Sequence, residues 1–159
     1  MHKNYNFIFS FVLIFFFVCA TEAQKPCPTN VDGKSFSKLK SKVRKHVGET
    51  VAFDAEVLAV KSGYNDIPYF SATLENGEVI WIASMVSDKY VKPKAKLRLL
   101  GYIDLVQSDD AIARQYNNSG FQIRVFAMLD HSTKQMQISN AFESEVKIWV
   151  AGSIPSNRK

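Results

Sequence analysis

Residues 68–84, PYFSATLENGEVIWIAS, decide the fold of this chain. Two runs rich in β-branched and aromatic residues flank Asn76-Gly77, and both turn residues tolerate a positive φ, which predicts a β-hairpin. A two-residue turn at this dipeptide sets the register of the two strands. The expected pairs are Leu74 with Val79, Ala72 with Trp81, and Phe70 with Ala83. Large side chains then oppose small ones on this face, as in a packed interior.

The other face of the hairpin is a mixed surface. It carries Tyr69, Ser71, Thr73, Ile80 and Ile82. Because this set is neither strongly polar nor wholly apolar, it suits the binding of a ligand.

A strand and a helix are expected before the hairpin. From Thr50 the apolar residues recur at every second position, which predicts a strand with Asp54 and Glu56 facing solvent. The stretch Ser35–Val47 predicts a helix that ends at Gly48, with a stripe formed by Phe36, Leu39, Val43 and Val47. The lysines around this stripe favour a solvated face, and contact with phosphates or lipid head groups is the alternative.

Two more strands and a closing helix are expected after the hairpin. The first of these strands has one basic face, formed by Lys92, Lys94, Lys96 and Arg98, which alternate with apolar residues. This face either protects a sheet edge from pairing with other sheets or contacts phosphates. Gly101 predicts a bend or bulge. The stretch 120–129 is the last strand, with Phe126 and Met128 facing outward, and 141–151 is a helix for which a strand is the alternative.

Two segments carry a resemblance to the OB-fold, the oligonucleotide and oligosaccharide binding barrel. They are Gly48–Val57, GETVAFDAEV, and Leu97–Tyr102, LRLLGY, within the order strand, hairpin, connection and two strands over residues 48–129. The chain looks most like the small bacterial OB-fold modules found in exported proteins and in nucleic-acid binders, and no family within the fold is identified. The resemblance implies a mainly β protein, a five-stranded OB-fold-like barrel with an N-terminal helix and a C-terminal helix.

The same resemblance implies a ligand site on the second and third strands and the loops beside them. There Tyr64 and Tyr69 could stack on bases, and the basic strand could meet phosphates. Asp54 and Glu56 on the neighbouring strand argue against a polyanion. The expected ligand-binding residues are Tyr64, Tyr69, Ser71, Thr73, Ile80, Ile82, Lys92, Lys94, Lys96 and Arg98.

The first residues predict export. His2 and Lys3 precede the apolar run Phe7–Val18, and small residues at Ala20 and Ala23 suit cleavage, as in a secretory signal peptide. We therefore expect a periplasmic or secreted protein with no membrane span after cleavage, and a lipid anchor at Cys19 is the minor alternative. The expected organisation is a signal peptide at 1–23, a flexible segment at 24–34, one domain at 35–152 and a tail at 153–159.

Cleavage leaves Cys27 as the only cysteine, so no internal disulfide can form. Its thiol is expected to be unstructured, with pairing to a partner protein as the alternative. The formal charge of +5 favours encounters with anionic surfaces without defining a partner.

The sequence carries no enzymatic signature. No metal-ligand spacing, nucleophile motif or phosphate-binding loop is present, and no cofactor or metal is expected. Asp130-His131-Ser132 are adjacent in the chain and so are not expected to form a catalytic triad. The favoured hypothesis is a non-enzymatic adaptor in a cell envelope or secreted assembly, in which the mixed hairpin face, Phe126 and Met128 contact a protein partner. The alternative is binding of an anionic polymer, either single-stranded nucleic acid or an oligosaccharide.

Overall fold

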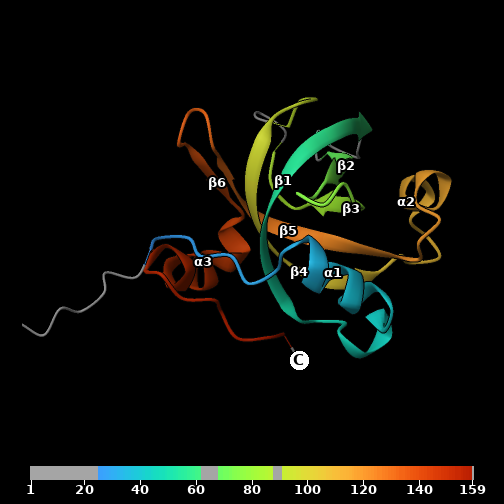
Figure 1. Ribbon diagram of the computed structural model, residues 1–159, viewed down its shortest axis with the longest axis horizontal. Coiled ribbons are helices and arrows are strands. Elements are labelled where there is room, and N and C mark those ends of the chain that lie inside the picture. Colours follow the sequence, from blue (N-terminus) through green and yellow to red (C-terminus); the bar gives the residue numbers. More distant parts are fainter. Residues whose placement is uncertain (1–24, 62–67, 88–90, 159) are drawn as a thin grey trace, which may run out of the picture.

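The computed structural model describes residues 25–61, 68–87 and 91–158, and Tyr64 lies outside them. Strands dominate this part of the chain (Figure 1). They are β1 (Thr50–Lys61), β2 (Tyr69–Thr73), β3 (Val79–Ser84), β4 (Lys96–Leu105), β5 (Phe121–Asp130) and β6 (Met136–Ile138). The α-helices are α1 (Gly33–Lys40), α2 (Ala111–Tyr116) and α3 (Glu143–Val150), and the short 3-10 helices are η1 (Val43–Lys45) and η3 (Asn140–Phe142).

The first five strands close into a barrel. Antiparallel pairing gives the order β3-β2-β1-β4-β5, and a parallel pairing of β3 with β5, which joins Ile82 to Ile123, closes the ring. This is the strand order of an OB-fold. The predicted class is confirmed: a mainly β, five-stranded barrel with a helix before it and a helix at its C-terminal end.

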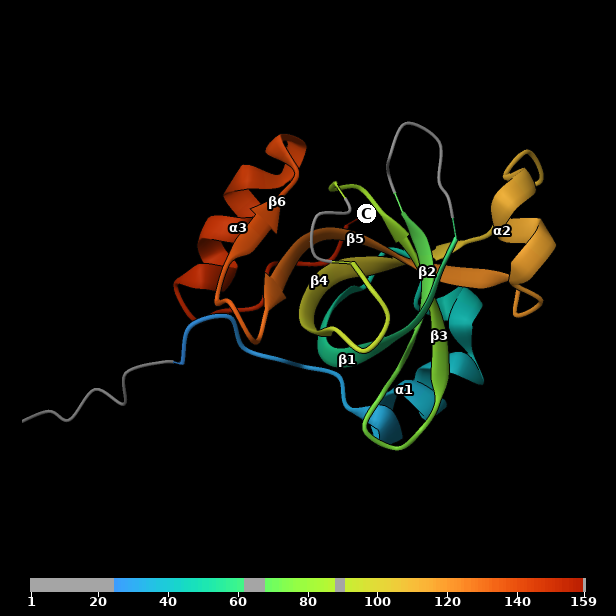
Figure 2. The same cartoon turned by 90° about the horizontal axis from the view of Figure 1, so that it is seen from above.

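Two clusters of buried side chains stabilise the fold. The first fills the barrel and includes Phe53, Phe70 and Ile123. The second lies outside the barrel, where η3 and α3 pack Phe142 and Trp149 over the outer side of β4 and β5. Figures 1 and 2 place α3 and α2 at opposite ends of the molecule.

The N-terminal helix packs on the barrel through its apolar stripe. Asp32 caps α1 through a hydrogen bond from Ser35 N, and the buried Phe36 meets Phe121 at 6.0 Å between ring centroids. The α-helix ends at Lys40, earlier than predicted, and the chain continues as η1. As a result Val47 is 43% exposed and does not extend the stripe.

The predicted hairpin forms, but its predicted register is wrong. Gly77 N donates to Leu74 O and Leu74 N donates to Glu78 O, so the loop holds three residues instead of two. Gly77 has φ +81°, as the last residue of a three-residue loop with a bulge requires. The observed pairs are Phe70 with Ile82, Ser71 with Trp81, and Thr73 with Val79. This shift of one residue exchanges the two faces of β3.

A bulge also changes the faces of β5. Leu100 pairs with Ala127 but Gly101 pairs with Val125, so Phe126 is an extra residue in β5 and the irregularity expected at Gly101 is confirmed. A Cβ at position 101 would lie 2.3 Å from Arg124 O, so glycine is required there. The outward surface predicted for Phe126 and Met128 is wrong, because each is 1% exposed.

Both ends of the described chain pack on the barrel. The segment before α1, expected to be flexible, is anchored where Cys27 N donates to Trp149 O at 3.0 Å, and Cys27 is 4% exposed. At the other end, Arg158 N donates to Gly48 O at 2.8 Å. None of the described helices is long and apolar enough to cross a membrane.

Candidate ligand-binding face

Three aromatic rings stack on the outer face of the barrel. Tyr69 of β2 lies over Trp81 of β3 at 5.3 Å between ring centroids and 11° between ring planes. Tyr116, the last residue of α2, stacks on Trp81 at 6.4 Å and 23°. We call these three residues the aromatic ladder. Offset stacks of this kind contribute to stability beyond the area that they bury.

Lys61 lies at the outer end of the ladder. Its Nζ is 4.5 Å from the centroid of the Tyr116 ring, a cation–π contact. The register of β1 with β2 shifts between Val57 and Ala59, and beyond this bulge Lys61 pairs with Tyr69. The bulge therefore sets which β1 side chains share the outer face with the ladder.

The connection between β4 and β5 holds the ladder in place. Asp110 caps α2 by accepting a hydrogen bond from Ala113 N at 2.9 Å. Just after α2, Asn117 Nδ2 donates to the Tyr69 hydroxyl at 3.0 Å and to Phe121 O at 2.7 Å. Burial raises the pKa of Tyr69 to about 12, so its hydroxyl stays protonated at neutral pH.

The structure separates the hairpin residues expected to bind ligand. Tyr69, Ser71 and Thr73 face outward on β2, although Tyr69 and Ser71 are only 5% and 3% exposed. Ile80 and Ile82 lie in the barrel core at 2% and 0% exposure, because the shifted register turns them inward.

The predicted basic strand is wrong in its first half. Residues 92–95 form a turn, in which Ala95 N donates to Lys92 O and Lys94 has φ +69°, and β4 begins only at Lys96. Lys92, Lys94 and Lys96 line a groove with His131 of the turn after β5. The four basic residues therefore do not form one face of a strand.

Arg98 is held in an ion pair. Its Nε and Nη2 donate to the two carboxylate oxygens of Asp54, each at 2.8 Å, and Nη1 donates to Cys27 O at 3.0 Å. His131 Nε2 lies 2.8 Å from Asp54 Oδ1. Burial opposes the ionisation of Asp54, but the contacts with Arg98 and His131 outweigh it and lower the pKa of this carboxyl group.

The residues Asp130, His131 and Ser132 do not converge. Asp130 Oδ1 accepts hydrogen bonds from Ser132 Oγ at 2.6 Å and from Thr133 N at 2.8 Å, which forms a local turn. His131 instead faces Asp54. Among residues 25–61, 68–87 and 91–158, no three His, Cys, Asp or Glu side chains are grouped so that they could hold a metal ion.

Sequence reasoning missed Trp81, Tyr116 and Lys61. Asn76-Gly77 also fits a three-residue loop, and that loop would have placed Trp81 on the outer face. The hairpin sequence therefore contained a signal for Trp81. No sequence signal joins Tyr116 to Trp81, since the two residues meet only when the β4–β5 connection folds over β3.

No family model matches this chain, and the search of curated proteins finds no significant match. Among solved structures, the chain is similar to one titled "Structure and Conformational Change of a Replication Protein A Heterotrimer Bound to ssDNA". The identity is 14%, the TM-score is 0.36, and the match covers 62% of this chain and 63% of that one, less than two thirds of its length. The strand order and the β3–β5 pairing define the barrel without this likeness.

Proposed function

We propose that this protein binds single-stranded nucleic acid on the outer face of β2 and β3. The observation that carries the proposal is the aromatic ladder with Lys61 at its outer end. The ladder lies on the face that OB-folds use for oligonucleotides and beside the β4–β5 connection, which commonly flanks that site. Aromatic rings accept any base by stacking, and a lysine beside them can meet the phosphate backbone.

The acidic residues of β1 oppose this proposal less than their sequence suggests. Asp54 is neutralised by Arg98 and also contacts His131, and Glu56 pairs in register with Lys96 of β4. Both acidic residues precede the β1 bulge, whereas Lys61 follows it. The negative charge therefore lies on a different part of the strand from the ladder.

A protein-adaptor role, the hypothesis favoured by the sequence, has less support. Of its expected contact residues, Phe126 and Met128 are buried in the two clusters, and the mixed hairpin face loses Ile80 and Ile82 to the barrel core. Non-enzymatic binding remains part of the proposal. It is supported by the separation of His131 from Asp130 and Ser132, since a triad needs its members within hydrogen-bond reach.

The first test measures the affinity of the purified protein for a fluorescein-labelled 12-nucleotide single strand by fluorescence anisotropy. Trp81→Leu keeps an apolar side chain on β3 but removes the central ring of the ladder. Loss of base stacking, worth about 1–3 kcal/mol, should weaken binding by roughly 5- to 150-fold.

Tyr102→Leu is the matched control, because Tyr102 stacks on Phe142 in the cluster at the α3 end, away from the ladder. This variant should bind like the wild type, and thermal unfolding checks that both variants are folded. Failure of the wild type to bind, or equal affinity of Trp81→Leu and the wild type, would contradict the proposal.

A further inference from the structure

Gln122 of β5 is a buried amide without hydrogen bonds. Its exposed fraction is 0%, and among the described residues neither Nε2 nor Oε1 has a partner. Buried polar groups in native proteins are almost always paired, because an unpaired group loses its water without compensation. An amide with both ends unpaired calls for an explanation.

The strand pairing places Gln122 beside the aromatic ladder. Its neighbours Phe121 and Ile123 belong to the barrel core, so alternation turns Gln122 to the outer face. Ile82 pairs with Ile123 across the parallel β3–β5 contact, and Trp81 and Gln122 each come one residue earlier. The two side chains are therefore neighbours on the same face.

The end of α2 also lies close to Trp81 and to the start of β5. Asn117 Nδ2 donates to Phe121 O, directly before Gln122, and Tyr116, the residue before Asn117, stacks on Trp81. Tyr116 is the outermost ring of the ladder: it is 37% exposed, while Tyr69 is 5% exposed. Its centroid is also farther from Trp81, at 6.4 Å against 5.3 Å for Tyr69. Tyr116 is thus the ring that an incoming planar group can replace with the least disruption.

We propose that a nucleobase replaces Tyr116 on Trp81 and that the Gln122 amide reads the edge of this base, with adenine preferred. The inference rests on the proposed function and adds a specificity-determining residue to it. A glutamine amide matches adenine in two hydrogen bonds: Oε1 accepts from the N6 amine and Nε2 donates to N7. Guanine presents two acceptors on that edge and cannot form both bonds. The ligand thereby satisfies the two atoms that are unpaired in the free protein.

The experiment compares two 12-nucleotide strands, one of deoxyadenosine and one of 7-deaza-deoxyadenosine, which keeps the ring and the N6 amine but lacks the N7 acceptor. Wild-type protein should bind the deaza strand roughly 2- to 12-fold more weakly, the effect of one lost hydrogen bond. Gln122→Leu should bind both strands equally, and deoxyadenosine more weakly than the wild type does.

Thermal unfolding separates recognition from a structural role. Gln122→Leu replaces an unpaired buried amide with an apolar group of similar size, so its unfolding midpoint should rise by about 3 °C. If Gln122 only supported the fold, Gln122→Leu would lower both the stability of the protein and its affinity for the strand. Gln137→Leu is the matched control, because Gln137 Oε1 is also buried and unpaired, but on β6; its affinity and its discrimination should equal those of the wild type.

The outcomes distinguish this inference from the proposed function. If the wild type binds both strands equally, or Gln122→Leu keeps the discrimination, the role of Gln122 is overturned while nucleic-acid binding stands. If the wild type binds neither strand, both proposals fall.

Discussion

Asp54 lies between Arg98 and His131 and contacts both, although its position on an alternating strand marks it only as exposed. The side chains that meet it come from distant parts of the chain: Arg98 lies 44 residues away and His131 lies 77 residues away. Asp54 and Glu56 face solvent, as the alternation predicted, but Asp54 is paired with Arg98 and so opposes a polyanion less than expected. The sign of a surface depends on such pairings, which a strand pattern does not contain.

We predict that Asp54→Asn lowers the free energy of unfolding by about 1 kcal/mol at pH 7, since a charge-assisted pair that is 48% exposed at the carboxylate is partly screened. The folded protein lowers the pKa of this group, so its contribution is present above the ordinary carboxyl pKa of about 3.9 and is lost as pH falls through the lower, folded value. Urea unfolding at pH 7 and pH 2 measures the difference.

The difference in the free energy of unfolding between the wild type and Asp54→Asn should therefore be smaller at pH 2 than at pH 7. Glu75→Gln, at an exposed carboxylate in the hairpin loop, is the control and should change stability little at either pH. If Asp54→Asn lowers the free energy of unfolding by the same amount at pH 2 and pH 7, the charge of Asp54 does not contribute to this contact.

At the scale of elements, the types of strand and helix follow from the sequence, whereas the faces of the strands do not. Alternation in residues 50–57, turn residues at 76–77 and the spacing of Val146 and Trp149 all predict elements that the structure contains. Two of the errors are shifts of one residue: the three-residue loop turns Trp81 outward, and the β5 bulge turns Met128 inward. Side chains alternate with a period of two, so a single extra residue moves every later side chain to the other face.

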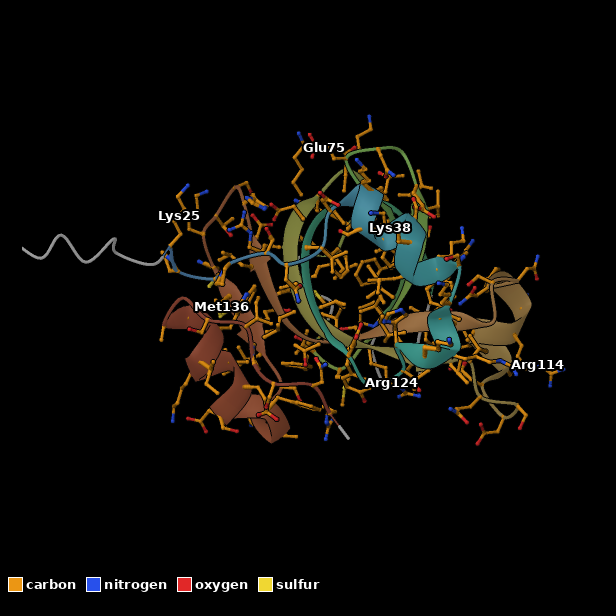
Figure 3. All side chains as sticks on the ribbon, turned by 60° about the horizontal axis from the view of Figure 1, so that its bottom comes forward. Lys25, Lys38, Glu75, Arg114, Arg124 and Met136 are labelled. Carbon is orange, nitrogen blue, oxygen red and sulfur yellow. The ribbon has the colours of Figure 1, made fainter. Side chains whose placement is uncertain are left out.

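The basic residues are likewise divided among elements. Figure 3 shows Lys38 on α1 and Arg114 on α2 well apart, and Lys92 and Lys94 lie in the turn before β4. Among residues 25–61, 68–87 and 91–158, Lys61 is the lysine that contacts a ring of the ladder.

We therefore predict a weak salt dependence of single-strand binding. One phosphate contact by Lys61 should give a slope of about −0.7 in a plot of log Kobs against log salt concentration, whereas four basic residues acting together would give roughly −3. Lys61→Gln should flatten the slope, and the double variant Lys92→Gln, Lys94→Gln should keep it. Anisotropy titrations from low to moderate salt test this, and a steep slope that the double variant removes would assign the phosphates to the turn before β4.

At the scale of the whole molecule, hydrogen bonds attach both terminal segments of the described chain to the rest of the fold. Asn157 Oδ1 accepts from Thr50 N at 3.0 Å, and Trp149 Nε1 donates to Pro28 O at 2.8 Å. Residues expected to be a flexible segment and a tail thus satisfy polar groups of β1 and α3.

We also propose that residues 1–23 direct export, on the pattern of charge, apolar run and small residues alone. Expression in a bacterium with a periplasm should yield a processed protein that begins at Thr21 or Gln24. N-terminal sequencing of the periplasmic fraction measures this, with a protein that lacks residues 1–23 as the control that stays inside the cell. Recovery of the unprocessed chain in the cytoplasm would contradict export.

The sequence by itself determined the mainly β class, the helices at both ends of the barrel, the hairpin and the irregularity at Gly101, because these depend on local periodicity and turn chemistry. Only the tertiary structure decided which residues share a surface. The aromatic ladder joins β2, β3 and α2, and the parallel closure of the barrel brings β5 beside β3. Such contacts depend on loop length, bulges and chain closure between distant segments, so local patterns cannot specify them.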